Sequence, residues 1–157
     1  MNTSSDKLTF VVDRMLGRLA KWLRVAGFDA LYDGKYKRED LIKISEQTGR
    51  IIITRDTWFE SQGGREAVVL HDNYTIGQLK EFFRRHNIVP DPARFFTRCI
   101  VCNSELMIVS RDEVKDVVPS FVLSTQQGFS KCPSCSRIYW GGTHKEKMLE
   151  TLKVIFP

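Results

Sequence analysis

The chain has 157 residues, 42% of them hydrophobic, and its 24 lysines and arginines against 19 acidic residues give a formal net charge of +5. This composition excludes a disordered chain, a collagen-like fibre and a disulfide mini-protein, because the apolar content suffices for a core and four cysteines are too few to staple this length. The positive charge favours an anionic partner.

The sequence contains no apolar run long enough to span a membrane. Its first residues, MNTSSDK, lack the basic segment followed by an apolar one that marks a secretory signal. We therefore expect a soluble, cytoplasmic protein with no membrane partner.

Short apolar strands alternate with amphipathic helices over the first part of the chain. The strand candidates are too short for helices and are rich in β-branched residues, whereas the helix candidates repeat apolar residues every three or four positions. We expect strands at 8–12, 29–32, 51–54 and 67–70, and helices at 15–26, 39–48 and 76–86. Gly27 and Gly49 are expected to end the first two helices. This alternation predicts an α/β fold in which helices cover both faces of a parallel sheet.

All four cysteines follow position 98, in the two pairs Cys99-Ile-Val-Cys102 and Cys132-Pro-Ser-Cys135. Before these pairs, the segment Val89-Pro-Asp-Pro92 ends the helix predicted at 76–86. We therefore predict two domains, at residues 1–92 and 93–157, the second ending in a helix. Residues 103–131, between the pairs, have room for a hairpin and a small insert.

Two Cys-x-x-Cys pairs supply four thiolates, which is a closed ligand set for a structural Zn²⁺ ion. In a reducing cytosol this spacing is more often metal-binding than disulfide-forming. A redox dithiol is the alternative, although neither pair follows a thioredoxin-like strand-to-helix pattern. Because a four-thiolate site has no open position, the zinc is expected to stabilise the small second unit and to take no part in catalysis.

Three residues after the second cysteine pair have alternative interpretations. His144 is either a phosphate contact or fifth ligand, or a structural histidine, which is the commoner case where four thiolates already satisfy zinc. Tyr139 and Trp140 either stack on exposed bases or pack the ribbon against its neighbour, and we favour packing.

Two of the predicted strands lead into aspartates, Asp13 after the first and Asp56 after the third, and Asp72 follows the fourth. Ligands of parallel sheets sit beyond the carboxyl ends of the strands. Converging carboxylates repel unless a cation joins them, so Mg²⁺ or Mn²⁺ is the natural partner of Asp13 and Asp56. The plainer interpretation is that each aspartate caps a helix or a turn.

Basic side chains lie beside this predicted acidic site. Arg14, Arg18 and Lys21 share a face of the first predicted helix, which suits a polyanionic substrate, although helix charges are often merely solvated. We expect these three residues to bind substrate, and Arg55 to join them.

Three segments carry a resemblance to a known family: FVVDRMLGRLAKWLR at 10–24 with AGFD at 26–29, GRIIITRD at 49–56, and RIYWGGTH at 137–144 after the paired cysteines. Together they resemble the Mut-seven C-terminal RNase family over nearly the whole chain. The resemblance implies a PIN-like nuclease domain, with a parallel sheet sandwiched by helices, followed by a small zinc-ribbon module. It also implies hydrolysis of RNA by clustered acids with magnesium or manganese.

By this resemblance Asp13 matches the first acid of the family and Asp56 the aspartate of its Thr-Arg-Asp motif. The family pattern most often has a further Asp where this chain has Arg38, within Lys37-Arg-Glu-Asp40. Glu39 or Asp40 is the substitute, and Asp40 is preferred because a carboxylate at a helix N-terminus can face the strand ends.

The sequence thus predicts a metal-dependent endoribonuclease with Asp13 and Asp56 as metal ligands, Asp40 as a weaker third and Asp33 or Asp72 as outer candidates. The ribbon is expected to hold or present RNA. The alternatives are a non-catalytic zinc-ribbon protein that binds nucleic acid and has a degenerate acidic site, and a phosphoacceptor receiver domain. The receiver domain fits less well, because it usually has an acidic pair where this chain has Asp13-Arg14.

Overall fold

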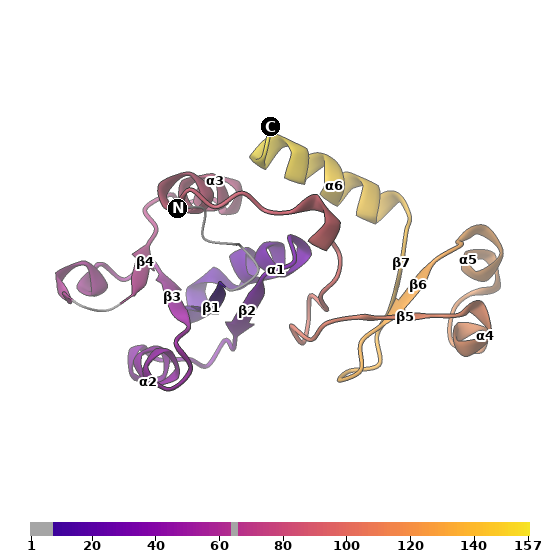
Figure 1. Ribbon diagram of the computed structural model, residues 1–157, viewed down its shortest axis with the longest axis horizontal. Coiled ribbons are helices and arrows are strands. Elements are labelled where there is room, and N and C mark those ends of the chain that lie inside the picture. Colours follow the sequence, from indigo (N-terminus) through magenta and orange to yellow (C-terminus); the bar gives the residue numbers. More distant parts are fainter. Residues whose placement is uncertain (1–7, 64–65) are drawn as a thin grey trace.

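The computed structural model describes residues 8–63 and 66–157 (Figure 1). A parallel sheet of order β2-β1-β3-β4 forms the first part of the molecule. Its strands are β1 (Thr9–Val12), β2 (Asp29–Tyr32), β3 (Ile51–Thr54) and β4 (Ala67–Val69). The helices that follow β1, β2 and β4 are α1 (Gly17–Val25), α2 (Arg38–Thr48) and α3 (Thr75–His86), while β3 leads into a 3₁₀ helix, η3 (Thr57–Ser61). The α/β prediction is confirmed.

The structure divides the first predicted helix into a 3₁₀ turn, η2 (Arg14–Leu16), and α1. Leu16 leaves helical geometry, at φ −111° and ψ 34°, and its N–H donates to the Asp13 carbonyl. Gly27 follows α1 at φ +91°, and a Cβ there would lie 2.5 Å from the Arg94 carbonyl oxygen. Only glycine suits both the backbone angle and this close approach.

Alternate residues of each strand pack on opposite faces of the sheet, as the pleat requires. Phe10, Val12 and Ile53 join α1 and α3 in the larger core. Val11 and Ile52 face the other way and pack with Leu41 of α2 and Phe59 of η3. Both faces are therefore covered by helices, which explains why the strands are almost wholly apolar.

The second unit is an antiparallel sheet of order β5-β6-β7 that carries the cysteines (Figure 1). Its strands are β5 (Met107–Val109), β6 (Phe129–Lys131) and β7 (Ile138–Trp140). Two short helices, α4 (Arg111–Val114) and α5 (Ser120–Thr125), lie between β5 and β6. Their core is small and centres on Val114, Val118 and Phe129, so this unit buries little apolar surface of its own.

The last helix, α6 (Thr143–Ile155), returns from the ribbon to the first unit (Figure 1). Leu152 and Ile155 belong to the larger core, and the Phe156 ring lies edge-on to Phe83 with centroids 4.5 Å apart. The 3₁₀ helix η4 (Pro92–Arg94) lies in the connection between the units. The division at residues 92 and 93 stays a prediction, and the packing of α6 shows that the larger core draws on both sides of it.

Candidate functional site

Asp13 and Asp56 follow the neighbouring strands β1 and β3, so both lie at the carboxyl edge of the parallel sheet. The Asp13 N–H donates to the Ile53 carbonyl at 2.9 Å, which fixes Asp13 beside β3. The buried Thr54 hydroxyl donates to Asp13 Oδ2 at 2.6 Å and accepts the Asp56 N–H at 3.0 Å. One hydroxyl therefore links the Asp13 carboxylate to the backbone of Asp56, which lies 43 positions further along the chain.

Arg38, at the start of α2, forms an ion pair with Asp56. Its Nη2 and Nε lie 2.6 and 2.8 Å from Asp56 Oδ2, and its guanidinium stacks 4.6 Å from the Trp58 ring centroid. Asp56 Oδ1 accepts the Trp58 N–H at 3.0 Å. Burial raises the pKa of Asp56, but the hydrogen bonds from Arg38 and the Trp58 N–H outweigh it, so the pKa lies below its ordinary value.

Three other candidate acids, Asp40, Asp33 and Asp72, are each engaged in a local turn or cap. Asp40 accepts the Lys37 N–H in the capping box of α2. Asp33 and Asp72 accept the N–H groups two residues on, at Lys35 and Tyr74. Within the described residues, no three acidic side chains converge in a group that could hold a metal ion.

The predicted substrate-binding residues fall into two groups. Arg14, Arg18 and Lys21 are exposed on η2 and α1, beginning directly after Asp13. Arg55 points elsewhere: its Nη2 donates to Asn73 Oδ1 at 2.8 Å and to the His71 carbonyl, so it braces the loop after β4. Of these four residues, Arg14, Arg18 and Lys21 are the ones that present exposed cations on the helices η2 and α1 that follow Asp13.

The four cysteines converge in the second unit, with all four sulfurs within 4.8 Å of one another. Cys99 Sγ and Cys135 Sγ are 3.7 Å apart, which matches the edge of about 3.8 Å expected for a tetrahedron with Zn–S bonds of about 2.3 Å. The N–H groups of Cys102 and Cys135 each donate to the first sulfur of their own pair at 3.4 Å. The donor set fits Zn²⁺.

Local contacts favour a thiolate in this cluster. Burial raises the pKa of Cys99, but hydrogen bonds from the Tyr139 hydroxyl and the Cys102 N–H outweigh it and lower the pKa to about 7. The hydrogen bond with Cys135 raises the pKa of Cys102, because crowded sulfurs resist a second negative charge. Four thiolates therefore need a cation among them.

The residues after the second cysteine pair take different positions. Tyr139 Oη lies 3.1 Å from Cys99 Sγ, which makes its contact part of the cysteine centre. Trp140 is 38% exposed, and it lines a groove of about 710 Å³ with Phe96 and His144. His144 is exposed in the first turn of α6 and is not among the clustered ligands.

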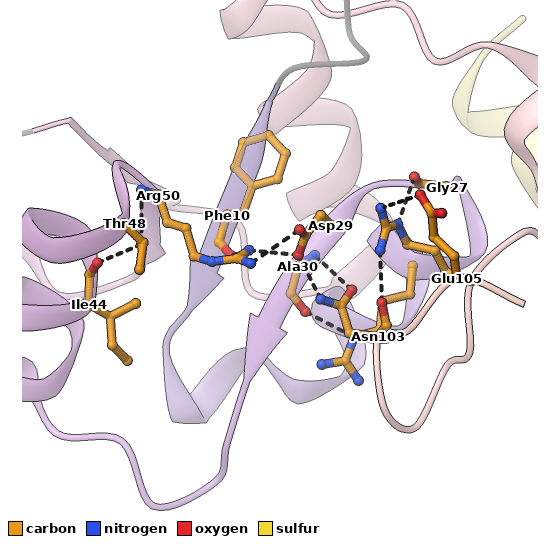
Figure 2. Close-up of polar contacts among 11 residues, drawn as sticks. Phe10, Gly27, Asp29, Ala30, Ile44, Thr48, Arg50, Asn103 and Glu105 are labelled. Atoms are coloured by element: carbon orange, nitrogen blue, oxygen red, sulfur yellow. Dashed lines mark hydrogen bonds and ion pairs between the residues drawn. The ribbon is translucent and has the colours of Figure 1, made fainter. Parts of the chain in front are cut away.

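A polar network joins the first cysteine loop to the start of β2 (Figure 2). Asn103 Oδ1 accepts the Ala30 N–H at 2.9 Å, and its Nδ2 donates to Asp29 Oδ1 at 2.7 Å. Arg50 binds both oxygens of Asp29. The buried Arg24 donates to the Ala30, Ile100 and Val101 carbonyls.

These contacts lie at the amino edge of the sheet, since Asp29 begins β2, whereas the acidic site lies at the carboxyl edge. The ribbon therefore docks at the end of the strands opposite to Asp13. Strands of four residues separate the two edges by about 13 Å.

The sequence did not predict the roles of several residues described above. Thr54 was only the last residue of an apolar strand, although a threonine two positions before an aspartate is a weak signal of this contact. Arg38 departs from the family pattern, but nothing in the sequence indicates that its partner is Asp56. Asn103 has no signal beyond its position after a cysteine pair.

The described residues include no helix long and apolar enough to cross a membrane. The family model described as Mut7-C RNAse domain matches residues 8–152. No curated protein and no solved structure matches the chain.

Proposed function

The chain belongs to the Mut7-C RNAse domain family, and from this premise we propose that it is a divalent-metal-dependent endoribonuclease with its catalytic centre at Asp13 and Asp56. The family implies a ribonuclease and an RNA substrate. The observation that carries the choice of site is the Thr54 bridge, because it ties the Asp13 carboxylate to the backbone of Asp56 at one edge of the sheet.

The donors fit one divalent ion better than two. Asp13 Oδ1 has no hydrogen-bond partner among the described residues, whereas both oxygens of Asp56 already accept hydrogen bonds. Mg²⁺ or Mn²⁺ at Asp13, when bound, would lower the pKa of a water and neutralise charge on the phosphodiester. Thr54 orients the Asp13 carboxylate, leaving Oδ1 for the ion, whereas the Asp40 carboxylate is oriented by its Oδ2 toward the cap of α2.

Arg14, Arg18 and Lys21 bind the RNA backbone in this proposal. The chain passes from Asp13 at the carboxyl edge along η2 and α1 to Arg24, whose guanidinium contacts the first cysteine loop. The exposed cations thus lie between the acidic site and the ribbon. RNA held on the ribbon, with Trp140 exposed in its groove, would reach the acids along this basic side of α1.

The decisive experiment replaces Asp13 by Asn in zinc-loaded protein. Asn retains an acceptor for the Thr54 hydroxyl and removes the charge, so we expect the fold to persist and RNA cleavage in Mn²⁺ to be abolished. The matched control is Asp112→Asn, which removes an exposed charge on α4 in the second unit. Full cleavage by the Asp13→Asn variant would refute the proposed centre.

A second candidate is a non-catalytic RNA-binding protein with a degenerate acidic site. The observation that favours it is the Arg38–Asp56 pair together with the lack of a third converging acid in the described residues. RNA binding that persists in EDTA, with no cleavage of single- or double-stranded RNA in Mn²⁺, would support this candidate over the enzyme.

A further inference from the structure

We propose that Arg38 acts as the second cation of the catalytic centre: its guanidinium holds Asp56 and binds the scissile phosphate, so the centre takes one divalent ion, at Asp13. This inference rests on the proposed ribonuclease function. It assigns a role to the residue at which the chain departs from the family pattern.

The first reason is that Asp56 is already neutralised by a fixed partner. Two guanidinium nitrogens donate to Asp56 Oδ2, and the Trp58 N–H donates to Oδ1. Stacking on the Trp58 ring restrains the guanidinium further. A divalent ion on Asp56 would have to displace this pair, whereas an ion on Asp13 would not.

The second reason is that Arg38 keeps donors for a further anion. A guanidinium has five N–H groups in a planar fork that matches phosphate oxygens. Asp56 receives hydrogen bonds from Nε and Nη2, and Nη1 meets no acceptor in the described part of the chain. The Arg38 side chain is 43% exposed, so these remaining donors are open to an RNA phosphate at the rim of the site.

The third reason is charge balance. Asp13 and Asp56 contribute two negative charges and Arg38 one positive charge, so a single divalent ion brings the centre to +1. That charge complements one phosphodiester, whereas two divalent ions beside Arg38 would bring the centre to +3. Arginine also remains charged at any physiological pH, so this cation is permanent.

The test compares Arg38→Ala, Arg38→Lys and Arg38→Asp in zinc-loaded protein, with Arg84→Ala as the control. Arg84 is an exposed arginine in the last turn of α3, which leads away from the carboxyl edge of the sheet. Mn²⁺ binding is counted by electron paramagnetic resonance, and RNA affinity is measured in the Asp13→Asn background, where cleavage does not consume the RNA.

We expect the wild-type chain to bind one Mn²⁺ ion. Arg38→Asp should bind Mn²⁺ at least ten-fold more tightly or bind a second ion, because that change places a third carboxylate beside Asp56. At saturating Mn²⁺, Arg38→Ala should lower kcat by about 10²- to 10³-fold, as loss of a donor to a developing charge does. Arg38→Lys should lower kcat less than Arg38→Ala does, and Arg84→Ala should leave both kcat and Mn²⁺ binding unchanged. RNA affinity should fall several-fold in Arg38→Ala.

A second Mn²⁺ in the wild-type protein, or Arg38→Ala cleaving as fast as wild type or faster, would overturn the proposal and make Arg38 a blocking residue. Unchanged RNA affinity in Arg38→Ala would also contradict it. If the wild-type protein cleaves no RNA, the proposed function fails, while the Mn²⁺ count and the RNA affinity still decide whether Arg38 serves as a cation for this site.

Discussion

The side chain of Asn103 links the cysteine loop to the parallel sheet, and its removal tests whether the two units are energetically joined. Asn103 is 7% exposed. Truncation leaves the buried Ala30 N–H without a partner, which costs about 1–3 kcal/mol, and removes a hydrogen bond to a charged carboxylate worth about 1.5–3 kcal/mol. Because Asp29 keeps its contacts with Arg50 and reaches water, we expect a loss of about 3 kcal/mol in the free energy of unfolding.

The backbone at Asn103 provides an internal comparison. Its φ is +68°, a region that costs a residue with a Cβ about 1–2 kcal/mol, and that glycine adopts freely. Asn103→Gly therefore loses the hydrogen bonds but also relieves this backbone cost, whereas Asn103→Ala keeps the Cβ, so Asn103→Ala should be the less stable of the two by about 1 kcal/mol.

Urea denaturation of zinc-loaded protein is the assay, with Ser104→Ala as the matched control. Ser104 pairs through its hydroxyl with Ser134 at an exposed position within the same unit, so its loss should cost less than about 0.5 kcal/mol. An Asn103→Ala variant as stable as the wild type would refute the view that Asn103 joins the ribbon to the sheet.

Three further predictions concern zinc, two glycines and Asp29. Removing zinc with a chelator should increase hydrogen exchange at the Ala30 amide, because the loop that carries Asn103 loses its anchor; unchanged exchange in mass spectrometry would contradict this coupling. Gly27→Ala should destabilise the protein by well over 2 kcal/mol in urea, whereas Gly49→Ala, at φ +73° in open space, should cost only about 1 kcal/mol. Burial raises the pKa of Asp29, but hydrogen bonds from Arg50 and Asn103 lower it on balance, so the stabilisation is present above the ordinary carboxyl pKa of about 4 and is lost as pH falls below it. In Asp29→Asn, the free energy of unfolding should therefore fall less steeply below about pH 4 than in the wild type. An unchanged pH dependence would contradict a stabilising role of the ionised Asp29.

Local signals in the sequence were sufficient for most of the fold. The apolar strands, the helix periodicity and the glycine at the end of α2, with φ +73°, are short-range features, and each predicted element is present. The four cysteines were also predicted to share one centre, because their spacing alone supplies a closed tetrahedral set. The family resemblance added the expectation of a ribonuclease, which the spacing of apolar residues does not contain.

The orientation of the polar side chains depended on the tertiary structure. The sequence suggested that Asp13 and Asp56 converge, yet only the pairing of β1 with β3 places Thr54 between them, and only the position of α2 brings Arg38 to Asp56. The docking of the ribbon at the amino edge likewise depends on contacts such as Asn103 to Ala30, which join residues 73 positions apart. Secondary structure follows from neighbours along the chain, whereas the charge and the ligand capacity of a site follow from which side chains the packing brings within hydrogen-bond reach.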